Sequence, residues 1–179
     1  MKPSLKLYKS FETERLQLRP TGVQDAFFIF KLMNTPAWLR YIGDRKINSE
    51  ARAAAYIRKK MLPQLVRLGF SNYTVIRRSD GKKLGSCGLY DRPGVEGIDL
   101  GFAFLPEYER QGYAFEASLR LLQAAREDFG LEKVFGITDR ENLPSQNLLE
   151  KLGFRREGSL RLPDEKEDVL LYVYIDQDE

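Results

Sequence analysis

The sequence predicts a single α+β domain, built on a central mixed sheet of about six to seven strands with flanking helices. Residues 70–105 alternate in polarity and contain turn signals, which predicts three antiparallel strands. Residues 97–138 then read as strand, helix and strand, and such a crossover makes its two strands parallel. No proline-, glycine- or serine-rich linker divides the 179 residues, so we expect one domain over 1–179.

The front of the chain is predicted to hold one strand and one amphipathic helix. Residues 15–19 alternate between apolar and polar side chains, as a strand with one buried face does. A helix follows and ends before Pro36, and a short aromatic-rich segment occupies 37–42. The spacing within this helix predicts a core face made of Val23, Ala26, Phe27, Phe30 and Met33.

A long helix is predicted from about residue 49 to residue 68, with Asn48 as its cap and Gly69 as its stop. One face is apolar, and the other has the basic residues Arg52, Arg58, Lys59, Lys60 and Arg67. This is first of all a solvated face opposite a core face. Over the whole chain, 29 basic and 26 acidic residues give a formal charge of +3, which is too balanced to indicate a nucleic-acid partner.

The composition excludes several kinds of catalysis. The chain has no histidine and one cysteine, Cys87, so we expect neither a metal site nor a Ser-His-Asp triad. Cys87 lies in the expected strand 83–90, where a buried structural thiol is favoured over a nucleophile. No apolar run approaches the length of a membrane span and no leader is evident. We therefore expect a cytoplasmic protein, monomeric or homodimeric, without a membrane partner.

Residues 105–117 join an apolar strand to an amphipathic helix through a glycine-containing loop. The helix is predicted to start near Gln111 or Gly112 and to run to about 128. Free N–H groups in its first turn and the positive end of its dipole favour an anion, and Gly112 allows a ligand to approach closely. An ordinary helix start with a glycine in its turn explains the same residues. From this loop alone, neither interpretation is favoured.

A second segment repeats the order of strand, loop and helix. Residues 133–138 read as a strand and 145–152 as a short helix, and strands at 154–160 and 168–175 complete the chain. The chain resembles the GNAT-superfamily N-acetyltransferases, in the branch of the ribosomal-protein alanine N-acetyltransferases. Three segments carry the resemblance: Phe11 to Pro20; Gly112-Tyr113-Ala114 with Glu116-Ala117; and Asn142, Ser145 and Lys151 to Phe154.

The resemblance implies a GNAT fold in which two parallel strands splay apart and form a cleft for acetyl-CoA. The backbone of Phe102, Ala103 and Phe104 would bind the pantetheine arm and polarise the thioester carbonyl. The family's phosphate loop reads Gln/Arg-x-x-Gly-x-Gly/Ala, and here Glu107 and Arg110 depart from it, Arg110 replacing the first glycine. The remaining cofactor residues would be Arg110, through its charge, Gln111, Gly112, Tyr113, Ala114 and Asn142.

Three residues are candidates for the chemistry. A primary amine must lose a proton before it attacks, and Glu96 or Asp99 is placed to accept it, directly or through water. Ordinary turn and edge charges explain these two carboxylates equally well. Leu149 stands where many GNAT enzymes have a tyrosine, so the resemblance gives the protonation of the leaving thiolate to Ser145. Capping of a helix explains Asn142 and Ser145 without any chemistry.

By the same resemblance, the acceptor groove is built from two segments. One contains Trp38 and Tyr41, and the other is the acidic loop 163–168. Acidic groups beside aromatic rings suit a cationic amine or a peptide amino terminus, although a charged hairpin tip would look the same. We expect an acetyl-CoA-dependent N-acetyltransferase acting on a peptide or protein N-terminal α-amine. The alternatives are a small amine (polyamine, amino acid or aminoglycoside) as acceptor, or a catalytically silent acyl-CoA-binding module.

Overall fold

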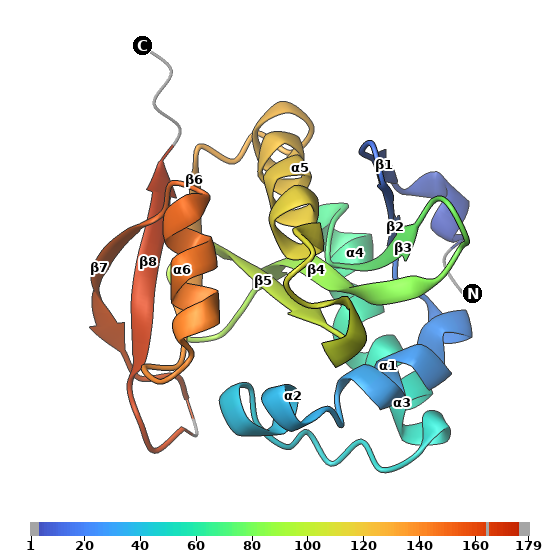
Figure 1. The fold of residues 1–179 in the computed structure, drawn as a ribbon, viewed down its shortest axis with the longest axis horizontal. Coiled ribbons are helices and arrows are strands. Elements are labelled where there is room, and N and C mark those ends of the chain that lie inside the picture. The colour runs from blue at the N-terminus through green and yellow to red at the C-terminus, as the bar shows by residue number, and fades with distance from the viewer. Residues whose placement is uncertain (1–3, 164, 176–179) are drawn as a thin grey trace.

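An eight-stranded mixed sheet forms the centre of the computed structural model, which describes residues 4–163 and 165–175 (Figure 1). The strand order is β1-β2-β3-β4-β5-β6-β8-β7, and all neighbours are antiparallel except β5 and β6. The strands are β1 Phe11–Glu12, β2 Leu16–Pro20, β3 Asn72–Arg77, β4 Lys83–Asp91, β5 Ile98–Phe104, β6 Lys133–Thr138, β7 Arg155–Leu160 and β8 Val169–Ile175. The predicted α+β class is confirmed, with one strand more than expected. The additional strand is β1, which is too short to show a period.

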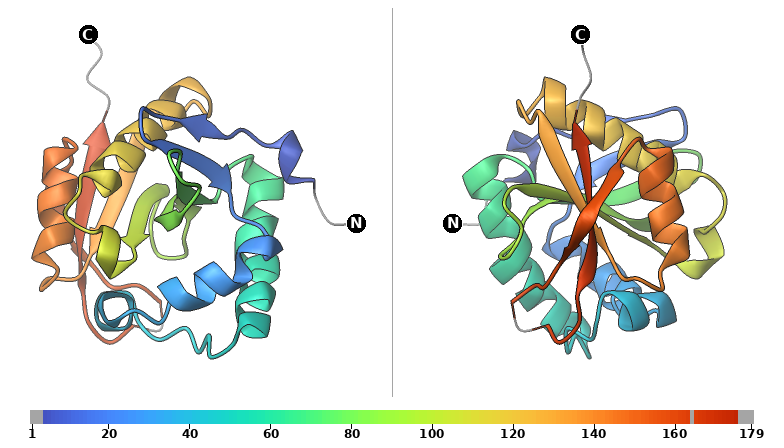
Figure 2. Two further views of the ribbon diagram at one scale, coloured as in Figure 1. Left: turned by 45° about the vertical axis from the view of Figure 1, so that its right-hand side comes forward. Right: turned by 90° about the vertical axis from the view of Figure 1, so that its left-hand side faces the viewer.

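Helices cover both faces of this sheet (Figure 2). On one face lie α5 and α6, and on the other lie α1, α3 and α4. The helices are α1 Ala26–Leu32, α2 Pro36–Tyr41, α3 Glu50–Tyr56, α4 Leu62–Leu68, α5 Tyr113–Glu127 and α6 Leu143–Lys151. Short 3₁₀ turns occupy Leu5–Leu7, Val23–Asp25 and Pro106–Tyr108.

The predicted long helix is interrupted at its middle. A π-helical segment, Ile57–Met61, joins α3 to α4. Pro63, the second residue of α4, has no N–H to donate, and the wider π-helical turn before it accommodates the missing hydrogen bond. The cap is Ser49 and not Asn48, because the Ser49 side chain accepts from the Arg52 N–H at 3.2 Å. Gly69 ends α4 in a left-handed conformation, as expected.

The predicted core face of α1 is partly wrong. Ala26 and Met33 are buried, but Phe27 is 57% exposed, and the other buried positions are Phe28, Ile29 and Leu32. A tighter 3₁₀ turn precedes α1, so residues counted from Val23 do not keep the 3.6-residue period. Asp25, at the end of that turn, is fully buried and ion-paired with Arg19 at 2.8 Å and Lys83 at 2.7 Å.

The two parallel strands separate soon after they begin. β5 and β6 pair only at Asp99↔Phe135 and Leu100↔Gly136. β4 continues beside β5 as far as Phe104, so β5 loses a partner on one side only. The helices α5 and α6 begin at the ends where β5 and β6 have separated (Figure 1). This confirms the fold predicted from the resemblance, with a gap between two splayed strands.

Candidate cofactor cleft and active site

The start of α5 leaves its first N–H groups without a side-chain cap. Gly112 is the N-cap residue, with φ of 81° and no side-chain hydrogen bond to the helix. The first N–H groups of a helix have no partner inside it, and the helix dipole concentrates positive charge there. This end of the helix therefore has the donors and the field that an anion requires.

Arg110, which stands at the family's first glycine position, has a left-handed backbone conformation that favours glycine. Its φ is 58°, in the left-handed region, where non-glycine residues are uncommon. The loop thus keeps a glycine-like path, and the side chain of Arg110 is exposed beside it. Gln111 braces the loop, because its Nε2 donates to the Glu107 carbonyl at 2.9 Å. A non-glycine residue in this region costs roughly 1–3 kcal/mol, and such strain is typical of functional sites.

The unpaired edge of β5 faces the gap. The N–H of Leu105 donates to Leu84 on β4 at 2.9 Å. Backbone groups alternate between the two sides of a strand, so those of Phe104 and Phe102 point toward the gap, and those of Ala103 point toward β4. Of the three residues expected to bind the pantetheine arm through their backbone, only Phe102 and Phe104 are therefore oriented to do so.

Thr138 is a candidate site residue that no sequence pattern singled out. It ends β6, where β5 and β6 have already separated, and it is only 6% exposed. Its Oγ1 is buried and has no hydrogen-bond partner among the described residues. An unpaired buried hydroxyl is unfavourable, so this position favours a ligand that hydrogen-bonds to it. A threonine at the end of a strand is too common to signal this from the sequence.

The start of α6 is capped by the side chain of its own N-cap residue. Asn142 is the N-cap residue, and its Oδ1 accepts from the Ser145 N–H at 3.3 Å. Ser145 contributes only its backbone to this cap, which leaves its half-buried hydroxyl available for another role. Leu149 is 1% exposed and packs in the core beside Gly136. Leu149 therefore has a structural role.

The two candidate bases lie in different environments. Asp99 is fully buried, and both its oxygens accept from Arg92, at 2.9 and 3.0 Å. Burial raises the pKa of Asp99, and the Arg92 guanidinium offsets this only in part. Glu96 is exposed on the β4–β5 loop. Of the two carboxylates, only Glu96 is open to water and to an incoming amine.

A buried polar network extends from Asp99 across the same face of the sheet. The Tyr90 hydroxyl donates to Asn72 Oδ1, and Asn72 Nδ2 donates to Thr21 Oγ1 at 2.8 Å. The Arg92 guanidinium carbon lies 5.4 Å from the centre of the Tyr90 ring. These residues belong to β3, β4 and the segments beside them, and the sequence pattern gave no sign of their proximity. Each looked like an ordinary strand or turn residue.

The aromatic segment expected to bind the acceptor is the helix α2, which lies opposite the start of α6 (Figure 1). Arg40 on α2 forms an ion pair with Glu141 at 3.2 Å and connects these two elements. Trp38 is half-buried, and its Nε1 is buried without a partner among the described residues. Tyr41 is half-buried beside Arg40, whose guanidinium carbon is 5.0 Å from its ring centre.

The second expected acceptor segment, 163–168, is mostly a charged hairpin tip. Asp168 pairs with Arg161 at 2.8 Å, and Glu165, Lys166 and Glu167 are exposed. Asp164 lies outside the described residues. The tip lies next to the loop that contains Glu96, since a Cβ on Gly94 would be 2.6 Å from Pro163. The structure therefore brings one candidate base and one candidate acceptor segment together.

The remaining expectations concern Cys87, metals and membranes. Cys87 is buried with its Sγ 3.6 Å from Ser118 Oγ, and burial raises the pKa of this thiol to about 12, which agrees with a structural role. Among the described residues, no three histidine, cysteine, aspartate or glutamate side chains gather as a metal site requires. In the same part of the chain, no helix has the length and apolar character to cross a bilayer.

A splayed pair of parallel strands beside an uncapped helix start is an arrangement that suits an extended ligand with an anionic end. The family model described as an acetyltransferase (GNAT) domain matches residues 15–155. The chain therefore belongs to the GNAT acetyltransferase family, and it is an N-acetyltransferase.

Curated relatives agree with this assignment. The N-acetyltransferase YnaD of Bacillus subtilis (strain 168), itself uncharacterised, is 26% identical over 146 residues, which are 82% of each chain. The spermidine N(1)-acetyltransferase of Escherichia coli (strain K12) is 25% identical over 146 residues, which are 81% of this chain and 75% of the relative.

Solved structures share the fold. An acetyltransferase from Bacillus anthracis superposes with a TM-score of 0.78 at 24% identity, covering 95% of this chain and 100% of the other. A ribosomal-protein alanine acetyltransferase from Vibrio fischeri gives 0.76 at 19% identity, with 95% and 98% covered. RimL, a ribosomal α-N-protein acetyltransferase in complex with coenzyme A, gives 0.79 at 15% identity, with 93% and 98% covered.

Proposed function

We propose that this enzyme transfers the acetyl group of acetyl-CoA to the α-amine of a peptide or protein N-terminus. Four features support a coenzyme A site: the uncapped start of α5, the exposed charge of Arg110, the unpaired backbone of Phe102 and Phe104, and the unpaired hydroxyl of Thr138. The first two suit a pyrophosphate, and the others suit the amides and carbonyls of a pantetheine arm. Asn142, at the start of α6, would contact the same arm from the other side.

The residues of the cleft divide the chemistry among them. Acetyl-CoA supplies a thioester, whose C–S bond breaks as the amine nitrogen forms the new C–N bond. Glu96 accepts the proton that the amine loses, directly or through water. Backbone N–H groups of Phe102 and Phe104 stabilise the charge on the carbonyl oxygen. The Ser145 hydroxyl donates a proton to the departing sulfur and takes one from water in return.

The unpaired indole N–H of Trp38 favours a peptide over a polyamine as the acceptor. Its buried Nε1 is a donor without an acceptor among the described residues. A peptide has carbonyl oxygens beside its amino terminus, whereas the nitrogens of a protonated polyamine are donors and cannot satisfy Trp38. The similarity of the fold to ribosomal-protein acetyltransferases supports the same choice. The spermidine acetyltransferase among the relatives makes a polyamine the second candidate.

A titration of coenzyme A into the protein tests the cofactor. A ligand that binds only the folded state stabilises it by about 2.7 kcal/mol at a hundredfold excess over its dissociation constant. We expect a rise in melting temperature that grows with the logarithm of coenzyme A concentration. An unchanged melting temperature at millimolar coenzyme A would contradict the cofactor assignment.

A panel of amines tests the acceptor. It contains peptides with a free N-terminus, the same peptides with a blocked N-terminus and an internal lysine, and spermidine. We expect acetylated product from the free peptides, and a smaller yield from them with Trp38→Phe, which keeps an aromatic ring but removes the donor. If spermidine is acetylated and none of the peptides is, the acceptor is a polyamine and not a peptide. Coenzyme A release without acetylated amine does not count as turnover.

A further inference from the structure

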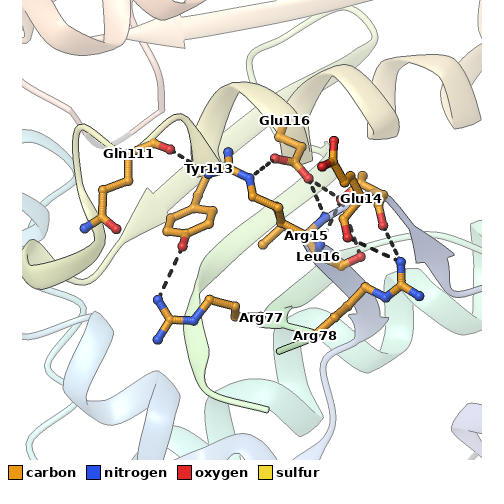
Figure 3. Close-up of polar contacts among 9 residues, drawn as sticks. Glu14, Arg15, Leu16, Arg77, Arg78, Gln111, Tyr113 and Glu116 are labelled. Carbon is orange, nitrogen blue, oxygen red and sulfur yellow. Dashed lines mark hydrogen bonds and ion pairs between the residues drawn. The ribbon is translucent and has the colours of Figure 1, made fainter. Parts of the chain in front are cut away.

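Two of the segments that carry the family resemblance, Phe11 to Pro20 and Glu116-Ala117, meet at the start of α5 (Figure 3). The carboxylate of Glu116 accepts three hydrogen bonds from the β1–β2 turn. They come from Thr13 Oγ1 at 2.6 Å, the Arg15 N–H at 3.0 Å and Arg15 Nε at 2.6 Å. The side chain of Glu116 is 20% exposed and that of Arg15 is 42% exposed, so water only partly screens this pair.

Arg15 also contacts the phosphate loop directly. Its Nη1 donates to the carbonyl oxygen of Gln111 at 3.0 Å. Its guanidinium carbon lies 4.4 Å from the centre of the Tyr113 ring, within the range of a cation–π contact. A Cβ on Gly112 would lie 3.2 Å from Arg15 Nη2, which places the guanidinium against this glycine. Arg77 holds the other end of Tyr113, donating to its hydroxyl at 3.3 Å.

The bond from Arg15 fixes the orientation of one peptide group. In a trans peptide, the C=O of one residue and the N–H of the next point in opposite directions. Since the Gln111 carbonyl points toward Arg15, the Gly112 N–H points away from it, to the opposite side of the loop. Rotation of this peptide by half a turn would aim a carbonyl where the N–H now points. Glycine accepts both signs of φ, so Gly112 by itself does not prevent that rotation.

We infer that Arg15 is a positioning residue that locks the Gln111–Gly112 peptide with its N–H directed at the cofactor's pyrophosphate. The carboxylate of Glu116 orients the Arg15 guanidinium through Nε, and the Tyr113 ring contacts the face of this guanidinium. The Nη1 atom of Arg15 then holds the Gln111 carbonyl. Arg15 touches neither the thioester nor the amine, and it acts through the loop. This inference rests on the proposed coenzyme A site, and it gives a role to the contacts between two segments that are distant in the sequence.

Arg15→Ala tests whether Arg15 locks the Gln111–Gly112 peptide in this orientation, an arrangement called the lock below. Arg78→Ala is the matched control. Arg78 Nη1 donates to the Thr13 carbonyl at 2.7 Å, so it braces the same turn without touching the loop. We expect Arg15→Ala to weaken coenzyme A binding by about tenfold, the loss of one charge-assisted hydrogen bond, and to raise the KM for acetyl-CoA similarly. Affinity for pantetheine, which has no pyrophosphate, and the KM for the amine stay unchanged. Arg78→Ala keeps the wild-type affinity for coenzyme A.

Arg15→Lys supplies the conservative variant if Arg15→Ala does not fold. Lysine reaches either Glu116 or the Gln111 carbonyl but cannot hold both, so we expect an intermediate loss. NMR relaxation dispersion on the ligand-free proteins provides a readout that needs no cofactor. The Gly112 amide should show microsecond-to-millisecond exchange in the Arg15 variants and none in wild type or Arg78→Ala.

Three results would overturn the lock: wild-type coenzyme A affinity in Arg15→Ala, an equal loss for pantetheine, or an equal loss in Arg78→Ala. A quiet Gly112 amide in the variants would also overturn it. If the wild-type protein binds no coenzyme A while the variants still show exchange at Gly112, the proposed cofactor is wrong. The conclusion that Arg15 holds the Gln111–Gly112 peptide in one orientation would still stand.

Discussion

The two helices that begin beside the gap start in opposite ways. α6 is capped from within by Asn142, whose side chain takes up the Ser145 N–H. α5 has no side-chain cap, and Arg15 and Gln111 brace its loop by bonding carbonyls and not N–H groups. A closed helix start contributes to stability, whereas an open one keeps its donors for a ligand. The difference favours the start of α5 over that of α6 as the proposed phosphate site, and it leaves α6 to present side chains.

The largest expected effect separates chemistry from capping at α6. Because the cap uses only the backbone of Ser145, Ser145→Ala should leave the melting temperature unchanged. It should lower kcat by about 10²-fold, or roughly 2.7 kcal/mol, if the hydroxyl protonates the thiolate. The measurement is steady-state turnover of a confirmed amine under conditions where chemistry limits the rate. If Ser145→Ala turns over at the wild-type rate, water or another residue protonates the thiolate.

The strained residue at α5 gives the next effect. Arg110→Gly keeps the left-handed path and removes the charge, so coenzyme A should bind more weakly by roughly 1.5–3 kcal/mol. The ligand-free protein should not be destabilised, since glycine relieves the strain. Lys46→Gly is the control, because Lys46 has a φ of 57° in a loop outside the cleft. Calorimetric titration should show a loss of affinity at residue 110 alone, and equal affinities would remove Arg110 from the site.

The cap of α6 provides a smaller effect, on stability. Asn142→Ala removes the acceptor for the Ser145 N–H and should lower the free energy of unfolding by about 1 kcal/mol. If Asn142 also contacts the pantetheine arm, affinity for coenzyme A should fall in the same variant. Urea unfolding with and without the ligand distinguishes the two contributions. A variant as stable as wild type would show that the Asn142 cap adds nothing measurable.

Acid should weaken the contacts that Glu116 makes at the start of α5, and it should leave the cap of α6 unchanged. Burial alone would raise the pKa of Glu116, but hydrogen bonds from Thr13 and Arg15 outweigh it and lower this pKa. A carboxylate with a lowered pKa stabilises the fold above its unfolded value, near 4.5, and loses this contribution as the pH falls below that value. α6 has no acidic residue in its first turn. Melting at pH 7 and pH 3.5 should show a smaller acid loss in Glu116→Gln than in wild type, and identical losses would refute this.

Local patterns predicted most of the fold, because seven of the eight strands alternate or lie between turn signals. They failed at α1, where a 3₁₀ turn shifted the helical period and exposed Phe27. The start of α5 was predicted within two residues, since Gly112 and the apolar spacing mark it.

Contacts between distant residues could not be predicted in this way. Arg15 and Glu116 are 101 positions apart, and only the fold makes them neighbours. Arg92 is near Asp99 in the sequence, but the loop between them decides that the pair is buried. Nothing in the type of residue 110 indicates a left-handed arginine, because this conformation is uncommon for any residue with a Cβ.

Amide hydrogen exchange, with and without saturating coenzyme A, tests most directly whether the open start of α5 is the phosphate site. We predict that exchange at Gly112, Tyr113 and Ala114 slows by about tenfold or more, which corresponds to roughly 1.4 kcal/mol. The Ser145 amide, already bonded to Asn142, should change little. Protection at Ser145 together with unchanged exchange at Gly112 to Ala114 would contradict the assignment.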